Sequence, residues 1–130
     1  MRRRVQGVRH MQQAGRRVLL VEDDPLILRN TADVLEGGGY EVVQACCFEE
    51  GMSGLDAEPA LLVTDIDLKG HPAGLELARS AAERLPDIRI VLVSGHVRPA
   101  VHQYPEKAVF FTKPYPPDAL LTILADSAYW

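Results

Sequence analysis

The sequence has few of the features that mark secreted or membrane-bound proteins. It holds only two cysteines in 130 residues, and these are adjacent, at Cys46 and Cys47, so they give neither a disulfide framework nor the spacing of a metal site. No apolar run approaches the roughly 18 residues that a membrane-spanning helix needs. The arginines near the start are not followed by the apolar stretch of a signal peptide. We therefore expect a cytoplasmic protein without a membrane partner.

Basic residues are scarce after the first 17 residues. Residues 1–17 hold six arginines and no acid, whereas residues 18–130 hold 8 basic and 18 acidic residues. We expect residues 1–17 to be a disordered basic tail and residues 18–130 to be one folded domain, a size that the 47% hydrophobic content can support. The acidic excess argues against nucleic acid as a partner, because such binding depends on Lys and Arg contacts to phosphates. It is compatible with a site for cations.

Short apolar runs alternate with segments of helical period along residues 18–130. This alternation is typical of an α/β protein with a parallel sheet and crossover helices. The predicted strands cover residues 18–21, 41–44, 61–64, 88–93 and 108–112. Asp24 and Pro25 favour the start of the first helix, and further helices are expected at 48–58, at 74–85 and after Pro117. Pro99 and Pro105 predict that any helix between the last two strands is short.

Polar side chains follow four of the predicted strands at the point where each strand ends. Ligands bind beyond the carboxyl ends of the strands in an open parallel sheet, so these side chains are expected to meet. They are Glu22, Asp23, Asp65, Asp67, Ser94 and Lys113. Clustered carboxylates favour a hard cation, and oxygen donors without His or Cys point to Mg²⁺ or Mn²⁺. A lysine, a hydroxyl and a nucleophilic carboxylate beside such a cation are the groups that phosphoryl transfer needs.

Four segments that carry these residues resemble the receiver domain of bacterial two-component response regulators. They are VLLVEDDPLI (18–27), LLVTDIDLKG (61–70), IVLVSGH (90–96) and FFTKPY (110–115). The resemblance covers residues 18 to about 127 and is closest to stand-alone receivers. It implies a flavodoxin-like, doubly wound sheet of five parallel strands in the order 2-1-3-4-5. The short interval from Ser94 to Lys113 departs from the family pattern and predicts a short fourth helix.

The resemblance also implies roles for the acidic residues. Asp65 matches the phosphoacceptor, and Glu22 and Asp23 match the acidic pair that holds the metal, with Asp23 as the direct ligand. Asp67 matches the position whose backbone carbonyl reaches the metal. One departure lies nearby, because Lys69 stands where many relatives have proline, which predicts a less rigid loop.

Three further residues match positions that respond to the phosphoryl group. Ser94 matches the hydroxyl that bonds a phosphoryl oxygen, and Lys113 matches the lysine that pairs with the phosphate. Phe110, three residues before Lys113, falls at the aromatic position that switches together with Ser94. Phosphorylation is thus expected to change a surface that partners bind.

The resulting hypothesis is a phosphorelay module rather than an enzyme. A sensor histidine kinase or a histidine phosphotransfer protein would donate the phosphoryl group to Asp65, and no output domain is expected. One alternative is a small phosphatase of the haloacid-dehalogenase type that uses Asp65 and Asp67, although its motif should lie near the first strand. Another is a degenerate receiver that only binds partners, which the intact set of site residues argues against.

Overall fold

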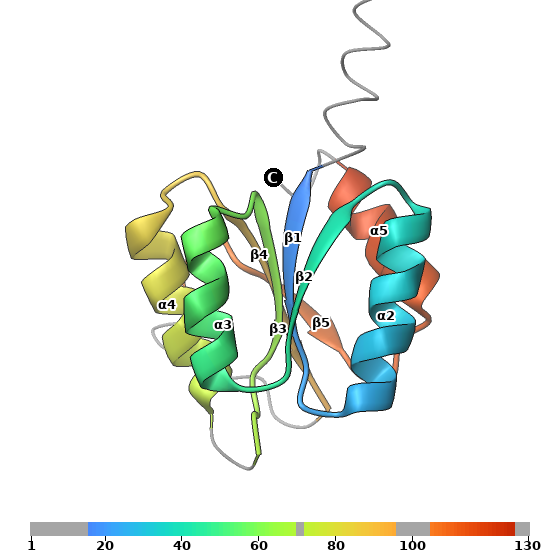
Figure 1. Cartoon of the computed structure of the whole chain (residues 1–130), viewed down its shortest axis with the longest axis horizontal. Helices are drawn as coiled ribbons and strands as arrows, with labels where there is room; N and C mark the ends of the chain where they lie inside the picture. The colour runs from blue at the N-terminus through green and yellow to red at the C-terminus, as the bar shows by residue number, and fades with distance from the viewer. Residues whose placement is uncertain (1–15, 70–71, 96–104, 127–130) are drawn as a thin grey trace, which may run out of the picture.

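The computed structural model describes residues 16–69, 72–95 and 105–126, which form one sheet with helices on both faces (Figure 1). Its elements are β1 (Arg17–Val21), α2 (Pro25–Gly37), β2 (Glu41–Ala45), α3 (Phe48–Gly54), a 3₁₀ turn η1 (Leu55–Ala57), β3 (Leu61–Asp65), α4 (Ala73–Arg84), β4 (Arg89–Ser94), β5 (Val109–Thr112) and α5 (Pro117–Ala125). The five strands are parallel and lie in the order β2-β1-β3-β4-β5. The predicted fold class and strand order are confirmed.

The strand pairing brings the carboxyl ends of the strands to one edge of the sheet. Val21 lies opposite Ala45 on β2 and opposite Thr64 on β3, and Asp65 lies opposite Val93 on β4. Ser94 in turn lies opposite Thr112, the residue before Lys113. Chain segments far apart in the sequence therefore end side by side, as the sequence predicts.

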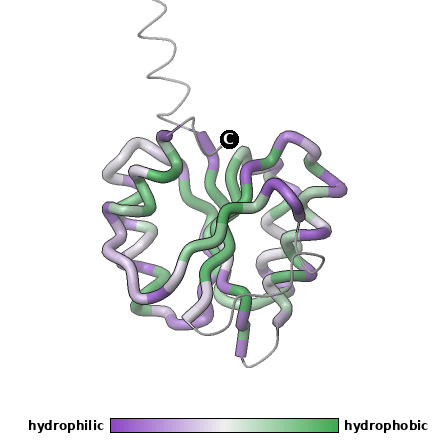
Figure 2. The backbone as a smooth tube through the Cα atoms, turned by 180° about the vertical axis from the view of Figure 1, so that it is seen from behind, coloured by the Kyte–Doolittle hydropathy of each residue, from purple (hydrophilic) through white to green (hydrophobic). Residues whose placement is uncertain are grey.

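Alternate residues of the strands pack against helices on opposite faces of the sheet. In β1, Leu19 and Val21 belong to the core cluster under α3 and α4, while Val18 and Leu20 belong to the cluster under α2 and α5. Figure 1 shows these two helix pairs on either side of the strands, and Figure 2 shows that the strands are mostly hydrophobic. Buried strands of this kind read as continuous apolar runs, because both of their faces are covered.

Helix α2 follows its sequence signals closely. The Asp24 side chain accepts hydrogen bonds from the N–H groups of Leu26 and Ile27 at 2.9 and 3.2 Å, and Pro25 occupies the first turn. Glycines end the helix, and Gly39 has a φ of 98° that suits the turn into β2. The prediction of Asp24 as a helix cap is confirmed, which leaves Glu22 and Asp23 for the site.

Helix α3 is shorter than the predicted 48–58. The helix ends at Gly54 and is followed by the turn η1. The chain then leaves the helical direction at Glu58, which has a φ of 52°. A Cβ added to Gly54 would lie 2.4 Å from Leu19 Cδ1, and one added to Gly51 would lie 2.8 Å from Leu77 Cδ2. The two glycines lower helix propensity, but they let α3 pack closely against β1 and α4.

Other boundaries shift by a residue. Strand β1 begins at Arg17, one residue inside the predicted tail, and the Arg16 carbonyl accepts a hydrogen bond from the N–H of Glu41 at 2.9 Å. Residues 1–15 and 96–104 lie outside the described residues, so the disorder of the tail and the short fourth helix stay predictions. In the described part of the chain, no helix is long and apolar enough to cross a membrane.

Candidate functional site

The side chains predicted to meet do so at the carboxyl ends of the strands. A small cavity of about 230 Å³ opens there, and the residues that line it are Asp23, Asp65, Asp67, Val93, Ser94, Gly95 and Lys113. Glu22, Asp65 and Ser94 are only 4 to 6% exposed. Burying polar groups this deeply is costly unless they are paired, so their partners decide what the site can do.

Lys113 joins the two buried carboxyl groups. Its Nζ atom lies 2.8 Å from Glu22 Oε1 and 2.8 Å from Asp65 Oδ1. Burial by itself would lower the pKa of Lys113, but the hydrogen bonds to Asp65 and Glu22 raise it above its ordinary value. The ammonium group is therefore charged at any physiological pH and is held directly beside the predicted phosphoacceptor.

Glu22 and Asp65 differ in their affinity for protons. Burial and the neighbouring Glu22 carboxylate raise the pKa of Asp65 to about 8. Burial also acts to raise the pKa of Glu22, but its hydrogen bonds to Asp65, Lys113 and the N–H of Asp24 outweigh that effect and lower it. In the metal-free protein the neighbouring Glu22 thus raises the affinity of Asp65 for a proton. A cation placed among these groups would replace that proton.

Asp23 completes an all-oxygen cluster. One carboxylate oxygen each from Glu22, Asp23 and Asp65 lies within 4.8 Å of the others. Asp23 Oδ2 also accepts a hydrogen bond from the backbone N–H of Lys69 at 2.9 Å. Three oxygen donors from two strand ends, without sulfur or nitrogen, fit a hard divalent cation.

Lys69 contributes to the site in a way that the sequence did not indicate. It has a φ of 55°, and its N–H is the group that binds Asp23. Proline, which has no N–H and a fixed negative φ, offers neither feature. The lysine that was predicted only to loosen the loop therefore ties the loop after β3 to the loop after β1.

Ser94 and Phe110 lie on neighbouring strands. Ser94 ends β4, and its carbonyl accepts a hydrogen bond from the N–H of Lys113 at 2.9 Å, which fixes the two side chains at the same rim. Phe110 is half-buried and packs against the core cluster under α3 and α4. It does not line the cavity, so its predicted switch role requires movement. The Asp67 side chain is exposed at the cavity mouth.

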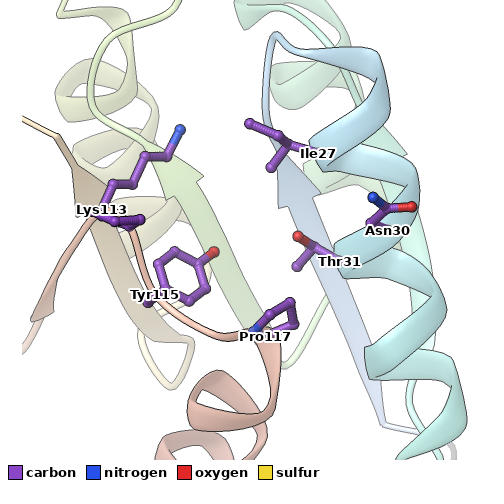
Figure 3. A pocket seen from close by; sticks show the side chains of 7 residues that line it. Ile27, Asn30, Thr31, Lys113, Tyr115 and Pro117 are labelled. Atoms are coloured by element: carbon purple, nitrogen blue, oxygen red, sulfur yellow. The ribbon is translucent and has the colours of Figure 1, made fainter.

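Sequence reasoning missed Tyr115, which joins the site to helix α2. Its ring packs edge to face against Phe111 with centroids 4.8 Å apart, and its hydroxyl is hydrogen-bonded with the Thr31 side chain. Burial and the nearby Asp65 raise the pKa of Tyr115 to about 12. Figure 3 shows Tyr115, Thr31 and Ile27 around a second cavity of about 270 Å³. The only sign of this contact in the sequence was an aromatic residue directly after Lys113 and Pro114. That sign did not identify Thr31 as its partner.

Gly74 was noted only as the start of a helix, yet it lies against the backbone of Asp65, the predicted phosphoacceptor. Its N–H donates to the Ile66 carbonyl at 2.9 Å. A Cβ added to Gly74 would lie 1.8 Å from the carbonyl oxygen of Asp65. The absent side chain therefore allows α4 to begin against the end of β3 and fixes where Asp65 stands.

Known proteins are similar to this chain in both sequence and fold. Residues 18–125 match the model of the response regulator receiver domain family. The chain is 36% identical over 107 residues to the response regulator receiver protein CpdR of Brucella abortus, covering 77% of this chain and 86% of that protein. It is 31% identical to the sensor protein TorS of Escherichia coli, covering 85% of this chain but only 13% of TorS.

Solved structures give the same result. A CheY-like receiver domain protein from Methanospirillum hungatei is 29% identical with a TM-score of 0.74, covering 85% of this chain and 90% of that one. A response regulator protein from Burkholderia pseudomallei has a TM-score of 0.76 at 24% identity, covering 88% of this chain and 68% of that one, a likeness of fold. That structure contains a phosphorylated aspartic acid and a calcium ion.

Proposed function

The chain belongs to the response regulator receiver domain family, and from that premise we propose that it acts in a phosphorelay with Asp65 as the phosphoacceptor. Members of this family are the phosphoacceptor modules of two-component signalling, and sensor kinases phosphorylate them. The observation that carries the assignment of Asp65 is its position, buried at the end of β3 with the Lys113 ammonium 2.8 Å away. The proposed donor is a sensor histidine kinase or a histidine phosphotransfer protein.

The proposed reaction transfers a phosphoryl group from the donor's histidine to a carboxylate oxygen of Asp65. A phosphorus–oxygen bond to Asp65 forms while the phosphorus–nitrogen bond to the donor breaks, and the imidazole takes up a proton as it leaves. Lys113 would hold one phosphoryl oxygen, and the Ser94 hydroxyl would donate a hydrogen bond to another. Positioning and charge neutralisation supply most of the catalysis in such transfers.

The cation that this chemistry needs is proposed to be Mg²⁺ or Mn²⁺. Asp23 and Asp65 would bind it directly with the backbone carbonyl of Asp67, and Glu22 would support the pair. The oxygen-only donor set of the carboxylate cluster supports this choice over zinc or copper. When bound, the cation neutralises the phosphoryl charge next to the carboxylates.

Replacing Asp23 by Asn should weaken Mg²⁺ binding by at least about tenfold, the range seen when groups that merely support a ligand are removed. Asn keeps an oxygen for the Lys69 N–H, so the fold should persist while a ligand charge is lost. Calorimetric titration with Mg²⁺ measures the effect. Asp24→Asn is the matched control, since it removes a neighbouring charge but leaves a good helix cap. Equal Mg²⁺ affinity in both variants would contradict the role of Asp23.

The deciding experiment separates the receiver from its two alternatives. We expect rapid, Mg²⁺-dependent transfer from at least one phosphorylated kinase in a purified panel, giving a protein-bound phosphoryl group that alkali releases. A haloacid-dehalogenase-type phosphatase would instead turn over p-nitrophenyl phosphate many times. A degenerate receiver would take no label from any kinase or from acetyl phosphate. Either of those results would overturn the proposal.

Phosphorylation is proposed to act through Ser94 and Phe110. A phosphoryl group on Asp65 would draw the Ser94 hydroxyl toward it and let Phe110 turn inward beside β5. Phe lacks a hydroxyl, so its inward state gains packing but no hydrogen bond. The two states should then differ by only a few kcal/mol, and both should be measurably populated.

Amide NMR with Mg²⁺ and beryllofluoride, a phosphoryl mimic, tests this switch. Outside the site itself, the large shifts should fall on residues 95–120, which include β5 and the start of α5. Residues 26–58, which hold α2, β2 and α3, should shift little. The reverse distribution would show that the signal leaves the site by another route.

The proposal also covers where the protein acts and which partners it has. A histidine kinase donor implies a cytoplasmic setting. The acidic balance of residues 18–130 supports a protein partner rather than nucleic acid or a membrane surface. The downstream partner would bind the surface around β5 and α5.

A further inference from the structure

The adjacent cysteines lie at the same edge of the sheet as the phosphorylation site. Cys46 follows β2 directly, and Cys47 precedes the first residue of α3. The pair by itself has no metal-ligand spacing in the sequence, but α3 adds Glu50 from its first turn. The sulfur atoms of Cys46 and Cys47 and a carboxylate oxygen of Glu50 all lie within 4.8 Å of one another.

Hydrogen bonds hold the Glu50 carboxylate beside Cys46. Glu50 Oε1 accepts the backbone N–H of Cys46 at 2.8 Å, and the Cys46 thiol is also hydrogen-bonded to Glu50. The two cysteines are half-buried and Glu50 is exposed, so solvent reaches the cluster. A cation with affinity for thiolate would fit between the two sulfur atoms and this oxygen.

We propose that Cys46, Cys47 and Glu50 form a second metal site, which binds a thiophilic divalent cation such as Zn²⁺. Two thiolates and one carboxylate would supply three ligands, and water would take the fourth position. A tetrahedral zinc site with Zn–S bonds of about 2.3 Å separates two sulfurs by about 3.8 Å. Side-chain rotations that move the sulfur and oxygen atoms by about 1 Å would therefore complete the site. Each thiol would release its proton to solvent on binding.

Two other uses of vicinal cysteines fit this geometry less well. Adjacent Cα atoms across a trans peptide are about 3.8 Å apart, which is shorter than the roughly 4.4 to 6.8 Å that disulfides span. Reactive and redox-sensing cysteines lie in electropositive surroundings, whereas these two thiols lie beside the Glu50 carboxylate. Metal binding remains the chemistry that uses all three groups.

The second site adjoins the carboxylate cluster at two points. The Ala45 carbonyl, directly before Cys46, accepts the N–H of Glu22 at 3.0 Å. Lys69, whose N–H binds Asp23, is also close enough for its charge to act on Cys46 and Glu50. The cysteine site nevertheless stands independently of the proposed phosphotransfer, because none of its ligands belongs to the oxygen-only cluster.

Titration of the reduced full chain with Cd²⁺, in excess Mg²⁺ to occupy the carboxylates, tests the proposal. The ultraviolet charge-transfer band of cadmium thiolates should rise to one Cd²⁺ per chain, and Zn²⁺ should abolish it by competition. The double variant Cys46→Ser, Cys47→Ser should show no band. The absence of a band in the wild type, or a stoichiometry of one Cd²⁺ per two chains, would overturn the site.

The Glu50→Gln variant tests the site more specifically, because it keeps both thiols. It should weaken Cd²⁺ and Zn²⁺ binding by at least about tenfold, a typical loss when a supporting group of a metal site is removed. Glu49→Gln is the matched control, since it removes an adjacent exposed charge outside the cluster and should bind like the wild type. Equal affinities in the two variants would refute the three-ligand site. Phosphorylation of the variants with acetyl phosphate reports separately on Asp65.

Discussion

Phosphorylation is expected to fall to background when Asp65 is replaced by Asn, while the fold is kept. The substitution conserves volume and removes the nucleophilic oxygen. It also removes a carboxyl group that burial and Glu22 disfavour in its charged form, so the free energy of unfolding at neutral pH should be equal or higher. Lys113 keeps Glu22 as a partner at 2.8 Å, so no buried charge is left unpaired.

Intact mass after incubation with Mg²⁺ and acetyl phosphate measures this result. Asp67→Asn is the control, because it makes the same chemical change two residues away on an exposed side chain. It should still accept a phosphoryl group, although its rate of dephosphorylation is expected to change. If Asp65→Asn became phosphorylated at the wild-type rate, another residue would be the acceptor.

The arrangement of the sheet was predictable because few forces determine it. Strands covered on both faces are continuous apolar runs, and parallel pairing leaves their carboxyl ends at one edge. Glu22, Asp65 and Lys113 each come directly after such a run, so their meeting follows from position in the sequence alone. The order of the strands was predicted only from the resemblance of four motifs to the receiver family. The hydrophobic pattern alone did not predict it.

Contacts that depend on exact side-chain placement were not predictable. Tyr115 and Thr31 are 84 positions apart, and only the packing of α2 beside the loop after β5 brings them together. Lys69 was expected to loosen its loop, because the sequence shows the loss of proline but not the hydrogen bond from the Lys69 N–H to Asp23. Glu50 joins the cysteines only because α3 begins directly after Cys47.

Replacing Gly74 by Ala is expected to damage both stability and phosphorylation. In an ordinary helix position, Ala in place of Gly stabilises by about 1 kcal/mol. Here the new Cβ would lie 1.8 Å from the Asp65 carbonyl oxygen and 2.8 Å from two further backbone atoms. Those atoms cannot rotate away as a flexible side chain can, so either α4 or the end of β3 must move.

The expected loss of stability is about 1 to 3 kcal/mol, the usual cost of forcing extra atoms into a packed interior. The expected loss of phosphorylation rate is about 100-fold, because a shift of roughly 1 Å at a reacting group costs that much. Asp65 would move relative to Lys113, whose Nζ now lies 2.8 Å from its carboxylate. Denaturant unfolding gives the first quantity, and labelling by acetyl phosphate under folding conditions gives the second.

Gly37→Ala is the matched control for Gly74→Ala. Gly37 is the last residue of α2, and a Cβ added there meets nothing within 4 Å. The same chemical change should therefore leave stability unchanged or raise it by up to about 1 kcal/mol, with normal phosphorylation. A Gly74→Ala protein as stable and as readily phosphorylated as Gly37→Ala would mean that the backbone of Asp65 tolerates displacement. The close approach of α4 would then not be what positions Asp65, the proposed phosphoacceptor.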